Sequence, residues 1–176
     1  MKRTFILALL LGAGATAAIP AATVHVKPGA DPANSASGAS WAAATNLQRA
    51  LAIAEDGDEI WLMSGVYFPD EGEGASPDDR ASTFLMKLGV AVYGGFAGTE
   101  TALEQRANPP AAPTVLSGDL TQDDADPDGD GIIGAAGDVI GTNSYHVVTV
   151  PANYREIIDR LAITAYRATG TNFSDK

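Results

Sequence analysis

Cysteine is absent from this sequence of 176 residues. Its absence excludes disulfide bonds, thiolate metal sites and a cysteine nucleophile, so the core has to stabilise the fold unaided. Basic residues are scarce, with 11 lysines and arginines against 22 aspartates and glutamates. Such an acidic surface argues against nucleic acid or an anionic membrane as a partner. It suits an exported protein that meets divalent cations.

Long hydrophobic runs are also missing, except at the start of the chain. Lys2 and Arg3 precede the uncharged apolar residues 4–11, and Ala15-Thr16-Ala17 offers a cleavage pattern of small residues. A membrane anchor is the alternative, but the run is shorter than the roughly 20 residues of a spanning helix. We therefore predict a secretory signal peptide over residues 1–22, cleaved between residues 17 and 22, and no membrane span. The remaining residues 23–176 are predicted to form one domain.

One segment has the pattern of an amphipathic helix. Thr45 and Gln48 have the spacing of a capping box, and Gly57 is suited to end a helix. Between them, apolar residues recur with the spacing of one helical face: Leu47, Ala50, Leu51 and Ala54. The pattern predicts a helix over residues 45–56. A helix placed before a series of short strands can cover the open apolar end of a stacked sheet.

Short apolar runs bounded by glycine and aspartate follow this helix, most clearly in residues 57–67 and 90–100. Because they do not alternate strictly with polar residues, they suit strands of a parallel sheet covered on both faces. Strands are predicted within residues 22–28 (at a sheet edge), 57–67, 83–86, 90–93, 114–118 and 145–150. Residues 99–106 are expected to form a helical turn. Residues 119–138 carry no strand pattern and are expected to form an inserted loop.

Residues 153–166 fit two interpretations. Asn153 and Glu156 have the spacing of a helix cap, followed by Ile157, Ile158 and Leu161. The same stretch also fits two strand pieces around a turn. Periodicity favours the helix slightly, whereas the β-branched content favours the strands.

Several segments occur together in a characteristic order. The sequence resembles the N-terminal region of secreted bacterial right-handed parallel β-helix proteins of the pectin-lyase-like superfamily, including polymorphic outer-membrane and choice-of-anchor proteins. The resemblance spans residues 24–166. It rests on the predicted helix, on Arg106, and on Ser40-Trp41, Gly57-Asp58-Glu59-Ile60-Trp61, Gly65-Val66-Tyr67-Phe68-Pro69, Val92-Tyr93-Gly94-Gly95-Phe96-Ala97-Gly98-Thr99-Glu100, Leu116-Ser117-Gly118-Asp119-Leu120 and Asn143-Ser144-Tyr145-His146-Val147-Val148.

This resemblance implies a mainly β protein, a short right-handed parallel β-helix with an N-terminal capping helix and coils over about residues 58–166. Two departures stand out. Relatives usually have a glycine where Arg160 stands and a glycine pair where Tyr166-Arg167 stands. Relatives also continue for more coils, so a truncated β-helix with an incomplete C-terminal end is expected. Such an end exposes free strand edges, which favours self-association.

The strongest candidate site is an aspartate-rich loop. Asp124, Asp126, Asp128 and Asp130 occupy alternate positions, and Gly129 and Gly131 lie among them. From Asp126 the run matches the first positions of an EF-hand or dockerin-like calcium loop. The bidentate glutamate of that motif is missing, because Gly137 stands in its place. The loop therefore fits either weak structural Ca²⁺ binding or an acidic, solvated turn.

The sequence gives little support for a catalytic site. His25 and His146 both fall within predicted strands and are isolated from other catalytic types. Arg155, Asp159 and Arg160 lie close together, as a polysaccharide lyase could require, but an exposed ion pair or a turn explains Arg155 and Asp159 better. No catalytic residue is assigned.

The aromatic residues allow two interpretations. They suit a core that is closed beneath the predicted helix, and they could also stack on sugar rings. These residues are Trp41, Trp61, Tyr67, Tyr93 and Phe96. The favoured function is a secreted or cell-surface non-enzymatic β-helix module that acts as an adhesive or scaffold or binds carbohydrate, stabilised by Ca²⁺. The alternative is a pectate-lyase-like enzyme that degrades polysaccharide, or a remnant of one.

Overall fold

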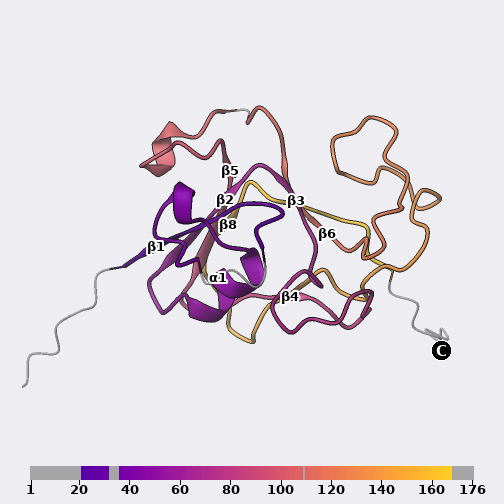
Figure 1. Ribbon diagram of the computed structural model, residues 1–176, viewed down its shortest axis with the longest axis horizontal. Helices are drawn as coiled ribbons and strands as arrows, with labels where there is room; N and C mark the ends of the chain where they lie inside the picture. The colour runs from indigo at the N-terminus through magenta and orange to yellow at the C-terminus, as the bar shows by residue number, and fades with distance from the viewer. Residues whose placement is uncertain (1–20, 32–35, 109, 168–176) are drawn as a thin grey trace, which may run out of the picture.

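The computed structural model describes residues 21–31, 36–108 and 110–167. The predicted signal peptide lies outside these residues, apart from Ala21 and Ala22. The described chain is mainly β, with three sheets in which every strand pair is parallel (Figure 1). Within the described residues there is one α-helix, α1 (Leu47–Ile53), and two short 3₁₀ turns, η1 (Trp41–Ala43) and η2 (Leu103–Gln105). No helix of these ranges is long and apolar enough to span a membrane.

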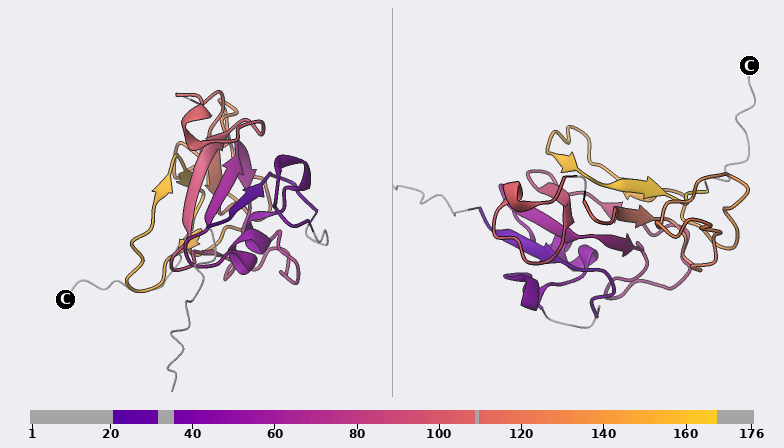
Figure 2. Two further views of the ribbon diagram at one scale, coloured as in Figure 1. Left: turned by 90° about the vertical axis from the view of Figure 1, so that its left-hand side faces the viewer. Right: turned by 90° about the horizontal axis from the view of Figure 1, so that it is seen from above.

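The strands fall into three groups. The first sheet has the order β1 (Thr23–Val26), β2 (Glu59–Met63), β5 (Ala91–Phe96) and β8 (Ile158–Asp159). The second sheet contains β3 (Gly65–Tyr67), β6 (Thr114–Ser117) and β9 (Ala162–Thr164). The third pairs β4 (Phe84–Leu85) with β7 (Val148–Thr149). Figure 2 shows the strands of the first sheet side by side.

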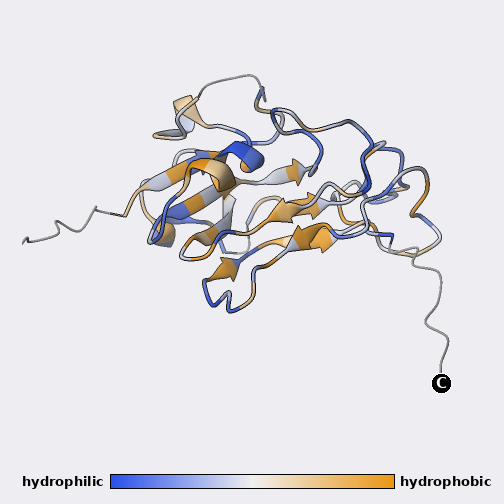
Figure 3. Ribbon diagram, turned by 90° about the horizontal axis from the view of Figure 1, so that it is seen from below, coloured by the Kyte–Doolittle hydropathy of each residue, from blue (hydrophilic) through white to orange (hydrophobic). Residues whose placement is uncertain are grey.

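After β1, the chain visits the sheets in a fixed order. One pass runs through β2, β3 and β4, the next through β5, β6 and β7, and the last through β8 and β9. Parallel pairing brings each strand beside its counterpart of the preceding pass, so equivalent positions line up. Val24, Ile60, Val92 and Ile158 form one such column. Figure 3 shows apolar residues concentrated on the strands.

The main core lies between the sheets and beneath α1. It contains Phe84, Leu116 and Met86 together with Val24, Ile60 and Val92 of the first column, and the helix contributes Leu47, Ala50 and Leu51. The predicted apolar face of the helix is therefore confirmed. Because this core contains no buried ion pair and no disulfide among the described residues, apolar packing carries the stability.

The ends of α1 differ from the prediction. Asn46, not Thr45, is the N-cap, and its side chain accepts a hydrogen bond from the Arg49 N–H at 2.8 Å. Thr45 is unavailable for capping because it is buried in a bridge to Val26. The helix ends at Ile53, and Gly57 lies in the following turn with φ +94°. The helix is thus shorter than residues 45–56.

The free edge of β1 is covered by the chain that precedes α1. The N–H of His25 donates to the Gly38 carbonyl at 2.7 Å, and the His25 carbonyl accepts from the Thr45 N–H at 3.0 Å. The Lys27 N–H donates to the Thr45 carbonyl at 3.1 Å. The predicted edge position of this strand is confirmed, and its backbone groups are satisfied locally.

At the other edge of each sheet, no chain segment among the described residues forms backbone hydrogen bonds of this kind to the last strand. β7, β8 and β9 are the last strands of their sheets. Large apolar side chains are exposed on or beside them, with 54% of Ile157 and 51% of Ile163 accessible. Bare apolar edges favour pairing with another chain. Self-association through this end stays a prediction, and sedimentation velocity over a range of concentrations would test it.

Residues 153–166 form strands, which decides between the two interpretations of this stretch. Val92 and Tyr93 pair with Ile158 and Asp159, and a turn then leads into β9. Arg160 occupies this turn with φ +57°, the left-handed region that favours glycine. The resemblance to β-helix proteins expects glycine at this position. The pairing of β8 with β5 therefore holds Arg160 in a backbone conformation that is unfavourable for arginine.

Most other predicted elements are present. Residues 114–118 contain β6 and residues 99–106 contain the turn η2, as expected. Residues 119–138 contain no strand and form the long loops on the right of Figure 1. Part of this insertion packs on the second sheet, because the Ile133 N–H donates to Thr164 Oγ1 at 2.9 Å. The predicted strand over residues 145–150 shrinks to Val148–Thr149. Tyr145, at the start of the predicted strand, contacts Arg80 instead of pairing in a sheet. Its N–H donates to the Arg80 carbonyl, and the Arg80 guanidinium lies over its ring.

Candidate functional site

The structure divides the predicted aspartate loop into two groups. Asp126, Asp128 and Asp130 lie together, with one carboxylate oxygen of each within 4.8 Å of the others. Asp126 closes the turn, because its two oxygens accept the N–H groups of Gly129 at 3.0 Å and Gly131 at 2.8 Å. This group, the Asp126 loop, is mostly exposed and lies in the insertion between β6 and β7, whose loops extend beyond the strands in Figure 2.

The carboxylates of this loop perturb one another. The Gly131 N–H lowers the pKa of Asp126, with a further contribution from the Gly129 N–H. The pKa of Asp128 is raised, first by its side-chain hydrogen bond to Asp126 and then by the charge of Asp130. A proton therefore stabilises this crowded group, and a cation placed among the same oxygens would do so as well.

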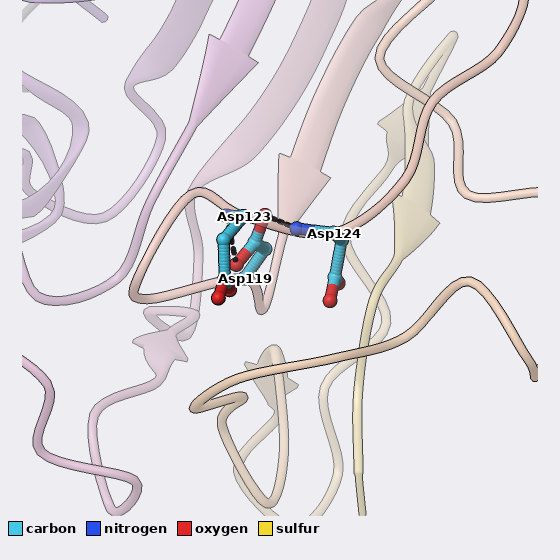
Figure 4. Close-up of side chains that lie close together, drawn as sticks. All are labelled: Asp119, Asp123 and Asp124. Carbon is cyan, nitrogen blue, oxygen red and sulfur yellow. Dashed lines mark hydrogen bonds between the residues drawn. The ribbon is translucent and has the colours of Figure 1, made fainter.

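Asp124 belongs to a different group, formed with Asp119 and Asp123 (Figure 4). Asp119 is buried, and its carboxylate accepts the N–H groups of Asp123 at 3.2 Å and Asp124 at 3.0 Å. Asn143 lies against the same group, because its Nδ2 donates to Asp124 Oδ2 at 2.7 Å. We call Asp119, Asp123, Asp124 and Asn143 the Asp119 cluster.

Sequence reasoning missed two members of this cluster. Asp119 was part of a strand motif, and Asn143 part of another motif 24 positions later. A bridge between Asp119 and Asn143 brings the two together, and the Leu120 N–H donates to the Thr142 carbonyl at 3.0 Å. No local pattern signals this pairing, since the intervening residues contain no strand.

The aromatic residues form a second cluster on the outer face of the first sheet, rather than closing the core beneath the helix. Trp61, Tyr93 and Phe96 are buried there, with Trp41 partly buried against them. The alternation of side chains along a strand explains the difference, because Ile60 and Leu62 point inward and Trp61 outward. Of the five aromatic residues, Tyr67 alone lies in the main core.

Four rings contact one another on this face. Trp61 stacks on Phe96 with centroids 4.6 Å apart, and His25 meets Trp41 edge-on at 4.6 Å. His25 is also 5.7 Å from Trp61, and Trp41 is 5.4 Å from Phe96. Beside these rings lies a pocket of about 280 Å³, the aromatic pocket. Its walls include Thr23, Ser40, Thr101 and Glu100 besides His25 and the two tryptophans.

Hydrogen bonds fix the walls of the aromatic pocket. His25 Nδ1 lies 2.8 Å from the Gly38 carbonyl, which can only accept, so the proton is on Nδ1 and Nε2 of the neutral ring is an acceptor. Trp41 Nε1 donates to the Glu100 carbonyl at 2.8 Å. Burial opposes ionisation of Glu100, but backbone N–H donors from Ala97, Thr99 and Gly98 outweigh it and lower its pKa. The charged Glu100 thus organises the turn that holds Trp41.

The residues that the sequence offered for catalysis do not form a common site within the described residues. His25 lies in β1, whereas His146 is exposed in the irregular chain before β7, not in a strand as predicted. Asp159 pairs with Arg106 at 3.0 Å rather than with Arg155. Arg160 donates to the Ala107 carbonyl at 2.7 Å. These charges therefore hold the last pass of the chain against the preceding one.

Comparisons with known proteins return no relative. No protein-family model, no curated protein and no solved structure matches the chain.

Proposed function

We propose that this protein is a secreted or cell-surface, non-enzymatic right-handed parallel β-helix module that binds carbohydrate through the aromatic pocket. The leader pattern of residues 1–22 supports export. The repeated order of the three sheets supports a β-helix, as do the columns of equivalent residues such as Val24, Ile60 and Val92. In a solenoid, each pass contacts only its neighbours in the same way.

The main support for carbohydrate binding is the aromatic pocket. A pyranose ring has an apolar C–H face and a rim of hydroxyl groups. Trp41 is partly exposed and offers an aromatic face, while His25 Nε2 and the hydroxyls of Thr23 and Ser40 offer hydrogen-bonding groups around it. The volume of about 280 Å³ is small for a ligand site, so a single sugar unit of a chain is the expected occupant.

Trp41→Ala is expected to weaken binding of the preferred polysaccharide about two- to tenfold, since one aromatic contact contributes roughly 0.5–1.5 kcal/mol. Titration of oligosaccharides from a broad panel, followed by calorimetry, measures the effect. Tyr166→Ala serves as the control because it removes an aromatic ring that is 64% exposed and lies outside the pocket. Trp41→Phe keeps a ring and is expected to retain most of the affinity.

Two outcomes would contradict the proposal. One is wild-type protein that binds no glycan of the panel, and the other is a Trp41→Ala variant that binds as tightly as wild type. Incubation with polygalacturonate and alginate in the presence of Ca²⁺ tests the enzymatic alternative. Release of unsaturated uronates, seen by their ultraviolet absorbance, would show a lyase instead.

A stabilising Ca²⁺ on the Asp126 loop is the second part of the proposal. Its support is the convergence of Asp126, Asp128 and Asp130, each with a carboxylate oxygen within 4.8 Å of the others. Ca²⁺ prefers six to eight oxygen ligands, and carboxylates and water supply them. An Asp126→Asn/Asp128→Asn variant is expected to lose this ion in a calorimetric titration. Identical isotherms for variant and wild type would rule it out.

A further inference from the structure

We propose that two copies of this chain associate end to end as a two-fold symmetric dimer. The interface is the end of the three sheets that is formed by β7, β8 and β9, and the strands of the two copies pair in antiparallel fashion across it. This partner and this geometry go beyond the binding of carbohydrate and do not depend on it.

The last strand of each sheet directs backbone groups toward the open edge. Three carbonyl groups beside the centres of these strands point the other way, since they accept N–H groups from the preceding pass of the chain: those of Thr149, Ile157 and Thr164. Along a strand, the N–H and C=O groups of successive residues point to opposite sides. The neighbours of these three residues therefore present their N–H and C=O groups to the open edge: Val148, Ile158 and Ile163.

The side chains of these three neighbours continue the apolar columns of the core. Their partners in the preceding strands are buried in the main core: Phe84, Val92 and Leu116. At the open end, by contrast, 38% of Ile158 and 51% of Ile163 are exposed. Strands added at these edges would satisfy the backbone groups and bury the apolar side chains at the same time.

The two ends of the sheets differ, and this difference selects the arrangement. At the opposite end, α1 contacts β1, β2 and β4, and residues 38–45 form hydrogen bonds to the backbone of β1. The right-hand view of Figure 2 shows β1 (indigo) and the last pass (yellow) on opposite sides. Because the edge of β1 is occupied, head-to-tail stacking into a filament is disfavoured. The same end of a second copy has the matching free edges, so like meets like in a closed dimer.

A two-fold axis through β8 matches all three edges. The chain enters the first sheet from the third and leaves it for the second, so these two sheets lie on either side of β8. The axis therefore brings β9 of one copy against β7 of the other. Since β9 belongs to the last pass and β7 to the pass before it, the advance of β9 along the stack fits the recess at β7. A single extended peptide could complete only one of these edges.

Charge complementarity agrees with this register. At the axis, Ile158 of each copy forms a hydrogen-bonded pair with its counterpart and exchanges two N–H···O bonds. Antiparallel pairing then places Glu156 of one copy opposite Arg160 of the other, twice in the dimer. The chain has 22 acidic and 11 basic residues, whereas residues 148–167 contain three arginines and two acidic residues. Contact through this end therefore avoids the repulsion between two acidic surfaces.

Sedimentation velocity of the full chain over a range of concentrations tests the proposal. We expect a reversible equilibrium between monomer and dimer, with no larger species. Ile163→Lys places a charge on the apolar end of both copies and is expected to weaken the dimer about tenfold or more. Ile53→Lys is the matched control, because Ile53 is 39% exposed and lies in α1 at the covered end. It should dimerise as the wild type does.

A charge exchange tests the register. Glu156→Lys and Arg160→Glu each place like charges opposite one another, so each variant alone should dimerise about threefold or more weakly. In an equal mixture of the two variants, opposite charges face each other at both positions, and the dimer should be recovered. Glu156 also accepts the Gly89 N–H, and Arg160 also donates to the Ala107 carbonyl, so far-UV circular dichroism first establishes that each variant folds.

A wild-type chain that stays monomeric at every concentration overturns the proposal, and so does one that forms filaments or oligomers larger than a dimer. If Ile163→Lys dimerises as tightly as Ile53→Lys, the interface lies elsewhere. A mixture of the charge variants that associates no better than either variant alone contradicts the two-fold axis through β8. If one of the charge variants fails to fold, the comparison of Ile163→Lys with Ile53→Lys decides.

Discussion

Phe84→Ala is expected to lower the free energy of unfolding by about 3–5 kcal/mol. Phe84 is 0% exposed and stands in β4, a strand of two residues that pairs only with β7. Its ring fills the main core beside Met86 and Leu116, and alanine would leave a cavity there. Urea unfolding monitored by circular dichroism measures the loss. The thermal midpoint should fall by roughly 6–20 °C.

The neighbouring residue provides a matched control. Leu85 occupies the same strand but is 59% exposed, so Leu85→Ala should change the stability by about 0.5 kcal/mol or less. A loss below about 1 kcal/mol for Phe84→Ala would mean that the third sheet does not help to enclose the core. Equal losses for both variants would contradict the orientation of β4.

Gly94→Ala is expected to destabilise the protein by about 2–3 kcal/mol, by overpacking rather than by forming a cavity. A Cβ atom at Gly94 would lie 2.5 Å from the Arg160 carbonyl oxygen and 2.9 Å from Thr114 Cβ. The last pass of the chain would have to move away from β5. Hydrogen exchange should therefore accelerate most at residues 158–164, where β8 and β9 lie, and equilibrium unfolding gives the total loss.

Gly134→Ala is the control for this substitution. A Cβ atom at Gly134 would meet nothing within 4 Å, and its backbone is outside the left-handed region. Its stability should equal that of the wild type within about 0.5 kcal/mol. A Gly94→Ala variant as stable as Gly134→Ala would show that the turn at Arg160 does not pack on β5.

The candidate sites could be predicted only in part. The spacing of Asp126, Asp128 and Asp130 indicated a group of converging carboxylates, and the structure brings these three together. Asp124 continues the same spacing but joins Asp119 instead. Spacing describes neighbours along a turn, whereas Asn143 and Asp119 meet across a bridge between distant segments. That bridge depends on how β6 and the chain before β7 are placed.

The aromatic residues illustrate the same limit. Their positions inside apolar runs correctly indicated burial of Trp61, Tyr93 and Phe96. The runs did not alternate in polarity, so the sequence carried no signal for which face each ring would occupy. In the structure, β2 is buried on both faces, with Ile60 in the main core and Trp61 on the outside.

Local residue patterns were enough to predict the short glycine-bounded strands, the apolar face of α1, the edge position of β1 and the strand-free insertion. Each of these depends on residues close together in the chain. Contacts between distant segments were needed to establish that residues 153–166 contain two strands, that Asn46 caps α1, and that the Asp119 cluster and the aromatic pocket exist. These features depend on backbone pairing between segments that are distant in the sequence, such as Val92 with Ile158 and Val26 with Thr45. Contacts between distant segments override local preferences, because a parallel sheet fixes its register through burial and backbone hydrogen bonds between strands.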